Sequence, residues 1–385
     1  MAQQVFKYSV GCDISKDTFN ACILEVYADM TSKVKASHKF KNETTGFNEF
    51  DLWVNRHKKH EVPISFTMEA TGVYYENLAW YLYEQECLVY VLLPYKTKHY
   101  LKSLGIKSKN DKIDAEGLSR MGAHQQHKPW KPYSNSIYAL RSLTRQHESV
   151  NKLKTRLINQ LHANEHSAFK STIVRKQLKS TLRLLEKQLE ELQTEISGMI
   201  ENDEKLQKKY SHFKPVKGIG KLSWATVIAE TNGFETFENQ RQLVSYSGYD
   251  IVENQSGNHV GKTKISKKGN SRIRRILYMP SLVSVRLREP VLYNLYQRVS
   301  ERTGIKMKGY VAVQKKLLVL MYHIWKNDTP YDRNYTKTFG EEESKSLFPL
   351  GSGGTTKKSS PDKRATQDEH SYELSPEVLF PLIQI

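Results

Sequence analysis

The chain has 385 residues, enough for two or three domains of about 150 residues each. Its 59 Lys and Arg residues against 41 Asp and Glu residues give a net charge of +18, which indicates a polyanionic partner, either nucleic acid or a membrane surface. No apolar run of about 18 residues occurs, and the N-terminus lacks a basic region followed by an apolar core. These features exclude a transmembrane or secreted protein. Three cysteines without a Cys-x-x-Cys pair exclude a disulfide framework and a structural zinc site, so we expect a cytoplasmic protein.

Residues 1–135 predict a mixed α/β domain. Short β-rich runs alternate with amphipathic stretches, and the segment 87–95 is so apolar that we expect a strand buried on both faces. The expected strands are residues 6–14, 19–27, 37–42, 64–70 and 87–95, and the expected helices are residues 46–58, 72–86 and 111–125. Three strands followed by alternating helices and strands indicate a mixed central sheet.

Residues 136–210 predict a helical coiled-coil spacer. Apolar residues advance in steps of four and three along a run without proline, which is the pattern of a heptad seam. The seam consists of Leu178, Leu182, Leu185, Leu189, Leu192, Ile196 and Met199. An earlier helix from Ile137 to Leu161 could pair with it as an antiparallel hairpin or as an intermolecular coil. A spacer that packs only on itself and a dimerisation element both stay open.

Residues 211–332 predict a compact α-rich domain that holds most of the basic excess, because they carry +11 of the net charge whereas residues 1–135 carry +3. The Gly-Ile-Gly at 218–220 lies between two helical runs and looks like a helix-hairpin-helix turn. Lys217 and Lys221 flank it and could hold a DNA phosphate, although a plain helix-helix turn is the alternative. Residues 333–385 are rich in Ser, Gly, Thr and charge, so we expect a disordered tail.

Four acids form the first candidate site. Asp13 and Glu69 each end an apolar strand, and Asp111 and Asp114 lie three apart at a helix start, where both carboxylates share one face. Such a set can converge on two divalent cations that hold the attacking and leaving oxygens in phosphodiester cleavage. Carboxylates select Mg²⁺ or Mn²⁺ over zinc. Each acid alone has a structural explanation, such as a helix N-cap for Asp111, but the set is the pattern of a ribonuclease-H-like nuclease.

An acid-free basic run at residues 256–276 forms the second candidate site. Its glycines and basic side chains predict a cradle for a nucleic-acid backbone, with a solvated basic loop as the alternative. The basic residues are Lys262, Lys264, Lys267, Lys268, Arg272, Arg274 and Arg275. Ser256, Ser266 and Ser271 lie in the same run, and chemistry alone selects no nucleophile among them. Tyr278 is a rival nucleophile, but its helical spacing favours a core or interface position.

These motifs, in this order, resemble those of the DEDD (RuvC-like) insertion-sequence transposases, the insertion-sequence one-hundred-ten family. The matching segments are Gly-Cys-Asp-Ile-Ser-Lys at Asp13, Met-Glu-Ala-Thr-Gly at Glu69, Lys-Asn-Asp-Lys-Ile-Asp-Ala at Asp111 and Asp114, then Gly-Ile-Gly-Lys, Ser-Tyr-Ser-Gly-Tyr and Ile-Ser-Lys-Lys-Gly-Asn. The resemblance spans residues 7–330. The tail exceeds what the family usually carries, and residues 252–255 are less basic than the family pattern.

The resemblance implies a transposase that cuts and rejoins donor and target DNA. It implies that Ser256 is the catalytic serine and becomes joined to DNA, while Asp13, Glu69, Asp111 and Asp114 bind Mg²⁺. Such a covalent intermediate conserves the phosphodiester energy, so strands rejoin without ATP. The resemblance also implies a structured bridge RNA as guide and dimers that assemble into tetramers, with the acids of one subunit meeting the serine of another. It places the protein at the nucleoid of a bacterial or archaeal cell.

Two functions from other classes stay open at this stage. One is a metal-dependent nuclease or junction resolvase in which the four acids hydrolyse DNA and Ser256 takes no part. The other is a non-catalytic RNA- or DNA-binding protein with structural carboxylates. A membrane partner loses support, because the basic charge gathers around glycines and a candidate nucleophile and does not follow an amphipathic helix.

Overall fold

The structure is a computed structural model that describes residues 4–105, 110–253, 255–256, 259–261 and 263–333. The described residues all belong to one compact unit, Met1–Arg333. The expected disordered tail therefore lies outside the described residues from residue 334 onward. Within the described ranges, no helix is long and apolar enough to cross a membrane.

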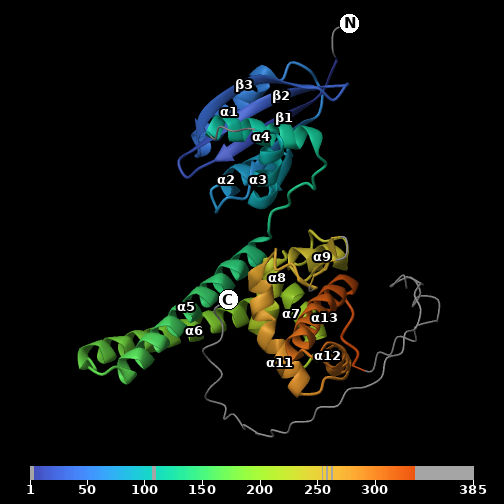
Figure 1. Ribbon diagram of the computed structural model, residues 1–385. Helices are drawn as coiled ribbons and strands as arrows, with labels where there is room; N and C mark the ends of the chain where they lie inside the picture. Colours follow the sequence, from blue (N-terminus) through green and yellow to red (C-terminus); the bar gives the residue numbers. More distant parts are fainter. Residues whose placement is uncertain (1–3, 106–109, 254, 257–258, 262, 334–385) are drawn as a thin grey trace, which may run out of the picture. The chain divides into compact units, whose positions relative to one another are not determined.

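A five-stranded mixed sheet organises the N-terminal part, with the strand order β3-β2-β1-β4-β5 (Figure 1). The strands are β1 (Val5–Ile14), β2 (Thr18–Tyr27), β3 (Ser32–Lys41), β4 (Ile64–Glu69) and β5 (Leu88–Leu92). The first three pair antiparallel, whereas β4 runs parallel to β1 and β5 runs parallel to β4. This order with these directions is that of a ribonuclease-H-like fold, which confirms the predicted fold class.

The apolar segment at residues 87–95 differs from its prediction. We expected one strand buried on both faces, but β5 ends at Leu92 and lies at an edge of the sheet, where Leu88 is 38% exposed. Leu93 is already the N-cap of the next helix. The expectation was wrong because this apolar run contains both an edge strand and the start of a helix. The periodicity of apolar residues alone does not show where one ends and the other begins.

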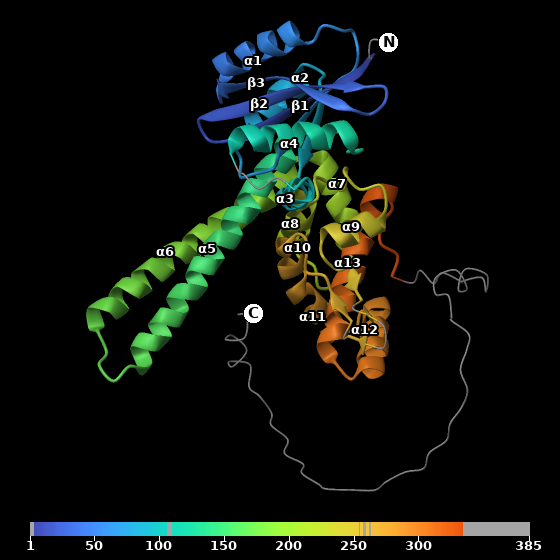
Figure 2. The same ribbon diagram turned by 45° about the horizontal axis from the view of Figure 1, so that its top comes forward.

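Helices cover both faces of the sheet. They are α1 (Thr44–His57), α2 (Glu76–Glu84), α3 (Pro94–Ser103) and α4 (Asp111–His124). The first two helices and one face of the sheet share a core in which the rings of Phe19, Phe40 and Phe50 lie 5.3 Å from one another. Figure 2 shows α1 and α4 on opposite sides of the strands. The face beneath α4 is therefore separate from the aromatic core.

The contact between α4 and β1 leaves no room for a side chain at position 11. A Cβ on Gly11 would lie 2.1 Å from the carbonyl oxygen of Ala115 and 2.2 Å from the amide nitrogen of Ser119. Ser9 Oγ also donates a hydrogen bond to the Ser119 carbonyl at 2.7 Å. The helix therefore rests on the strand backbone to backbone, and this contact fixes its height above the sheet.

Two long helices, α5 (Asn135–His166) and α6 (Thr172–Asn202), pack antiparallel along each other (Figures 1 and 2). Val150, Leu185 and Leu189 are buried between them, and Lys154 pairs with Glu186 across them at 2.9 Å. The heptad residues of α6 thus meet α5 of the same chain, which is the hairpin alternative of the sequence prediction.

The remaining helices enclose a second large core. They are α7 (Glu204–Phe213), α8 (Lys221–Glu230), α9 (Gln240–Tyr246), α10 (Ser271–Ile276), α11 (Tyr278–Arg286), α12 (Pro290–Thr303) and α13 (Lys306–Asn327). Trp224 lies at its centre, with ring centroids 5.3 Å from Tyr210 and 5.9 Å from Trp325. Ile137 and Leu140 of α5 join the same core, so the base of the long hairpin is part of this helical body.

The Gly-Ile-Gly segment forms a tight turn between α7 and α8. Gly218 has φ +101°, a conformation that favours glycine, and Gly220 is the N-cap of α8. A Cβ on Gly218 would also lie 2.5 Å from Ser284 Oγ, which donates to the Lys217 carbonyl at 2.7 Å. The hairpin turn is therefore locked against α11.

We expect Gly11→Ala to destabilise the protein by about 2–3 kcal/mol, because the new methyl group would force α4 away from β1. Gly198→Ala is the matched control. Its Cβ meets nothing within 4 Å inside α6, so this change is neutral or stabilises by up to about 1 kcal/mol. Urea unfolding of both variants measures the difference. Equal stabilities would contradict the close approach of α4.

Candidate active site

Asp13 and Glu69 lie side by side at the ends of two parallel strands. Cys12 of β1 is paired with Met68 of β4, so the two acids, each the next residue along, occupy the same level of the sheet. Both stand on the α4 face, because side chains alternate along a strand and Cys12 and Met68 belong to the aromatic core on the other face. The prediction that two strand-ending acids would be neighbours is consistent with this register.

The start of α4 brings the other two acids to the same face. Asn110 caps the helix, its side-chain oxygen accepting a hydrogen bond from the Ile113 amide at 2.9 Å. Asp111 accepts a bond of 3.5 Å from Asn20 Nδ2, and Asn20 is the β2 residue paired with Asp13. Asp114 lies one turn further along. The helix N-terminus, with its partial positive charge, therefore faces the acidic end of the sheet.

Two threonine hydroxyl groups hold the Glu69 carboxylate. Thr71 Oγ1 donates to one oxygen at 2.6 Å, and Thr97 Oγ1 makes a short hydrogen bond to the other. Thr97 belongs to α3 and is only 1% exposed. Its hydroxyl also lies 3.0 Å from the Pro94 carbonyl, so the first turn of α3 positions it. The orientation of Glu69 thus depends on α3, which the sequence did not predict as part of the site.

The donor chemistry at this end of the sheet suits a hard divalent cation, since carboxylate and amide oxygens are the groups that Mg²⁺ and Mn²⁺ prefer. Among the described residues, however, no three His, Cys, Asp or Glu side chains are close enough together to hold one metal ion. The backbone places Asp13 and Glu69 at one level of the sheet, with Asp111 and Asp114 at the start of the helix that covers the same face.

Ser256 lies on a small ribbon of four short strands between α9 and α10. They are β6 (Ile251–Val252), β7 (Gln255–Ser256), β8 (His259–Val260) and β9 (Lys264–Ile265), and we call them the serine ribbon. β6 pairs with β9, and β7 pairs with β8 with Ser256 opposite His259. The backbone of Ser256 therefore belongs to a short paired strand and not to a helix.

The base of the serine ribbon is closed by hydrogen bonds between the residues that enter it and those that leave it. The Ser266 amide donates to the Asp250 carbonyl at 2.8 Å, and Ser266 Oγ donates to Asp250 Oδ1 at 2.6 Å. The Lys267 amide reaches the Gly248 carbonyl at 3.1 Å. Ser266, one of the three candidate nucleophiles, thus has a structural partner.

The arginines of the basic run make contacts inside the protein. The Arg274 guanidinium donates to the carbonyls of Ser247 and Lys267 at 2.8 and 3.0 Å, across the base of the ribbon. Arg272 pairs with Glu148 of α5 at 2.9 Å, and Arg275 pairs with the same carboxylate. These three residues therefore have structural roles beside the predicted contacts with nucleic acid.

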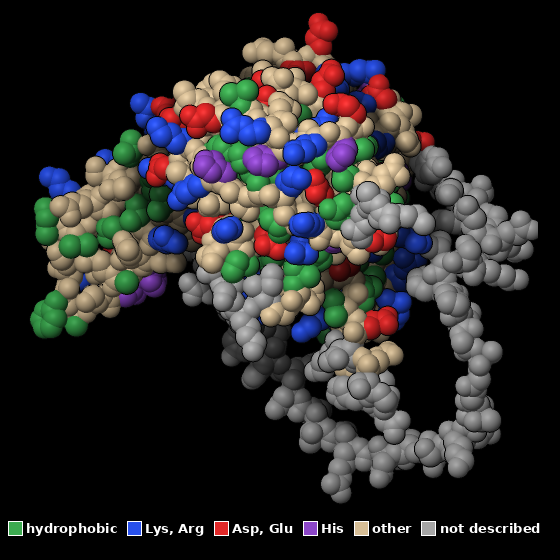
Figure 3. Space-filling view, turned by 90° about the horizontal axis from the view of Figure 1, so that it is seen from above, with side chains coloured by type: hydrophobic (Ala, Val, Ile, Leu, Met, Phe, Trp, Pro, Cys, Tyr) green, Lys and Arg blue, Asp and Glu red, His purple; other side chains and the backbone are tan. Residues whose placement is uncertain are grey.

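The lysines of the prediction fall into three groups. Lys221 forms an ion pair with Glu201. Lys217, Lys264, Lys267 and Lys268 are exposed. Lys262 lies outside the described residues. The exposed four remain predicted contacts for a phosphate backbone. On the face drawn in Figure 3, lysine and arginine side chains stand among acidic and uncharged ones, so no single basic field covers that face.

Glu230 at the end of α8 is a buried charge that the sequence analysis missed. It is 2% exposed and accepts two hydrogen bonds from Arg145 of α5, at 2.7 and 3.0 Å. Asn270 Nδ2 donates to it at 2.7 Å. Burial alone would raise the pKa of Glu230, but the bonds and charge of Arg145 outweigh burial and hold that pKa below its usual value. The carboxylate is therefore ionised at neutral pH.

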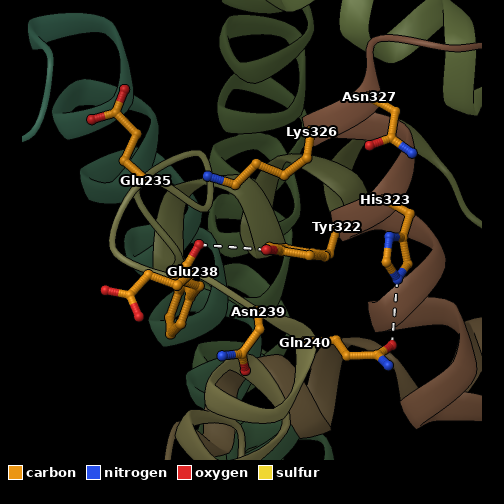
Figure 4. A pocket seen from close by; sticks show the side chains of 9 residues that line it. Glu235, Glu238, Asn239, Gln240, Tyr322, His323, Lys326 and Asn327 are labelled. Atoms are coloured by element: carbon orange, nitrogen blue, oxygen red, sulfur yellow. Dashed lines mark hydrogen bonds between the residues drawn. The ribbon is translucent and has the colours of Figure 1, made fainter.

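Figure 4 shows a pocket between residues 235–240 and the end of α13. His323 contacts Gln240 at 3.3 Å, and Tyr322 donates to the Phe237 carbonyl at 3.5 Å. Glu235, Glu238 and Lys326 give it mixed charge. None of the predicted site residues lines it, so it is separate from both candidate sites.

Comparison with known proteins agrees with these features. A transposase family model of the DEDD type matches residues 10–169, and a model described as transposase IS116/IS110/IS902 family matches residues 210–297. Two proteins named pilin gene-inverting protein, from Moraxella lacunata and Moraxella bovis, are each 28% identical over 328 residues. These matches cover 85% of this chain and 98% of each relative.

Two solved structures of Thermus thermophilus RuvC, one of them in complex with a Holliday junction substrate, are 13% identical to the chain. Their TM-scores are 0.26 and 0.24, and each comparison covers 32% of this chain and 99% of that chain. The fold assignment rests on the strand order and directions of the sheet.

The fold and the two family matches define a DNA transposase or recombinase, an enzyme that acts on DNA. The two models lie in the expected order and together cover more than half of the chain. The chain belongs to the IS116/IS110/IS902 family of transposases, which confirms the resemblance found in the sequence.

We expect Thr97→Val to raise the Mg²⁺ concentration needed for half-maximal DNA cleavage by about tenfold, because Glu69 loses the hydroxyl that orients it. Thr97→Ser, which keeps the hydroxyl, is the control and retains the original Mg²⁺ dependence. A titration of activity with Mg²⁺ measures both variants. An unchanged requirement in the valine variant would show that Thr97 does not position a metal ligand.

Proposed function

We propose that the protein cuts and rejoins DNA through a covalent bond between Ser256 and a DNA phosphate, assisted by the four acids. The observation that carries this proposal is the placement of Asp13 and Glu69 at one level of the sheet, with the N-terminus of α4 on the same face. An acidic site of this kind needs a nucleophile for strand transfer, and the serine ribbon offers one within the most basic part of the chain.

Asp13, Glu69, Asp111 and Asp114 would hold Mg²⁺ or Mn²⁺. The ion would supply positive charge that neutralises the phosphate under attack. The protein's own contribution is the arrangement of the ligands: β1 and β4 present two of the acids, α4 presents the other two, and Thr71 and Thr97 orient Glu69. Asn20 restrains Asp111 from the neighbouring strand.

In the proposed step, Ser256 Oγ attacks the phosphorus atom and loses its proton. The bond from phosphorus to one deoxyribose oxygen breaks, and that oxygen leaves as a hydroxyl group. The phosphate ester is conserved on the serine, so a hydroxyl group of another strand can reverse the step without an added energy source. The relatives named pilin gene-inverting proteins support such rejoining, because an inversion requires that the cut ends be joined again.

We further propose that the protein assembles from dimers into tetramers and uses a bridge RNA to select donor and target DNA. The exposed lysines around the serine ribbon suit a nucleic-acid backbone and do not read base sequence by themselves. Sequence choice by base pairing with an RNA would supply the missing specificity.

Covalent trapping tests the serine. We expect the wild-type protein, with Mg²⁺ and a nicked suicide DNA substrate, to give a protein–DNA adduct that survives denaturant. Ser256→Ala should lose the adduct entirely. Asp13→Asn and Asp114→Asn should lower its yield at least about a hundredfold, because each removes one ligand charge from the metal site.

The control is Ser271→Ala, which removes another serine of the same run. A Ser256→Ala variant that still rejoins DNA would overturn the serine mechanism. Cleavage without any adduct would favour a nuclease or junction resolvase that uses the four acids alone. Full activity of both acid variants would overturn the metal site.

The RNA and the oligomer are tested together. We expect the protein purified from cells that carry its element to bring a structured non-coding transcript with it, and ribonuclease treatment to abolish recombination. Sedimentation of the RNA complex with donor and target DNA should give the mass of a tetramer. Undiminished recombination after ribonuclease treatment would contradict the guide RNA, and a monomeric active complex would contradict the assembly.

A further inference from the structure

The residues that close the serine ribbon lead directly to the buried ion pair of Glu230. Asn270 follows the ribbon and precedes α10, and its amide and both polar atoms of its side chain form hydrogen bonds. Its amide donates to the Tyr246 carbonyl at 2.7 Å, and its side-chain oxygen accepts from the amides of Arg272 and Ile273 at the start of α10. Its side-chain nitrogen donates to Glu230 at 2.7 Å. Asn270 therefore fixes the point where the ribbon returns to the helical body.

Glu230 connects this point to α5. The Glu230 carboxylate accepts two hydrogen bonds from the guanidinium group of Arg145 and one from the side-chain amide of Asn270. Tyr246 completes the group, because its hydroxyl donates to the Glu230 carbonyl at 3.0 Å. A charge with 2% exposure costs free energy unless every such contact is made, so the arrangement tolerates little displacement.

A second contact between α5 and the same region acts in parallel. Glu148, one turn beyond Arg145 on α5, pairs with Arg272 and Arg275 of α10. α5 therefore contacts the segment after the ribbon in two ways. Arg145 reaches Asn270 through Glu230, and Glu148 pairs directly with α10. α5 is also one arm of the antiparallel hairpin with α6.

We propose that Glu230 is a positioning residue for the serine ribbon, acting through Asn270 on the ribbon and through Arg145 on α5. It touches no reacting atom. Its effect is to set the ribbon at a fixed place relative to α5, so that the place of the ribbon follows the place of the long hairpin. This inference rests on the proposed function in one respect, the assignment of Ser256 as the nucleophile.

An exchange of the two side chains tests the proposal. Asn270→Asp breaks the hydrogen bond between the two residues, because it opposes two carboxylates. Glu230→Gln leaves a single oxygen to accept from both Arg145 and Asn270, so at least one of these contacts is lost. In the double variant, Glu230→Gln with Asn270→Asp, the side-chain amide at position 230 donates a hydrogen bond to the carboxylate at position 270. This restores a bond between the two side chains and keeps one negative charge near Arg145. Asp is also a good N-cap, so α10 keeps its start. Glu235→Gln, an exposed glutamate of the same helical body, is the control.

We expect each single variant to slow adduct formation at saturating DNA at least about tenfold, with unchanged DNA affinity, because a displaced nucleophile loses rate without losing binding. The double variant should recover to within about threefold of wild type, the remainder reflecting one lost bond to Arg145. Hydrogen exchange of the amides of β6 and β9 should accelerate in the single variants and return in the double variant, while the amides of α12 stay unchanged.

Two results would overturn the proposal. In the first, folded single variants keep the wild-type rate and the wild-type exchange of the ribbon. In the second, the double variant is no better than the single ones in either measurement, which would make the group a source of stability only. The exchange measurement does not depend on catalysis. If wild-type protein forms no adduct at Ser256, the proposed function fails, while the exchange pattern still decides whether Glu230 positions the ribbon.

Discussion

The contact of α4 with β1 is the constraint on which the acidic site depends. Helix and strand backbones touch at Gly11, so α4 can lie only at one height and one position along the strand. Because that position is fixed, the residues at the helix start come to the end of β1 and β4, where Asp13 and Glu69 stand. A second close approach lies further along α4, at Gly122. A Cβ at this position would lie only 2.1 Å from Oγ1 of Thr67 in β4. The smallest residue of the Gly-Cys-Asp motif is thus as important to the site as the acid that follows it.

The helical body solves a different problem, which is to hold the serine ribbon, a segment that has almost no core of its own. The serine ribbon contains four strands of two residues each, and such short ladders are not stable alone. Its position comes from the surrounding polar contacts: Arg274 spans its base, Asn270 ends it, and the buried Glu230 ties it to α5. The strongly basic run therefore serves two purposes at once, since some of its charges bind protein groups and others remain exposed.

The sequence was sufficient for the fold class and the family, because local patterns and their order along the chain determine both. The four acids remain a prediction. The sequence was insufficient for partners that only register or distant packing brings together. Asn20 contacts Asp111 from 91 residues away, and Thr97 reaches Glu69 from α3, a helix that the sequence did not predict. Arg272 was assigned to phosphate because its neighbours in sequence are basic, whereas its neighbour in space is Glu148. The Asn270 cap had a local signal, an asparagine before a helix, that was available and was not used.

The closed base of the serine ribbon also bears on how such proteins diverge. Asp250 and Ser266 are hydrogen-bonded to each other, so the chain enters and leaves the ribbon at nearly one point. A segment whose two ends are clamped together can gain or lose residues at its outer end without disturbing the helices beneath it. A change in the length of the ribbon would therefore leave the clamp that carries it intact.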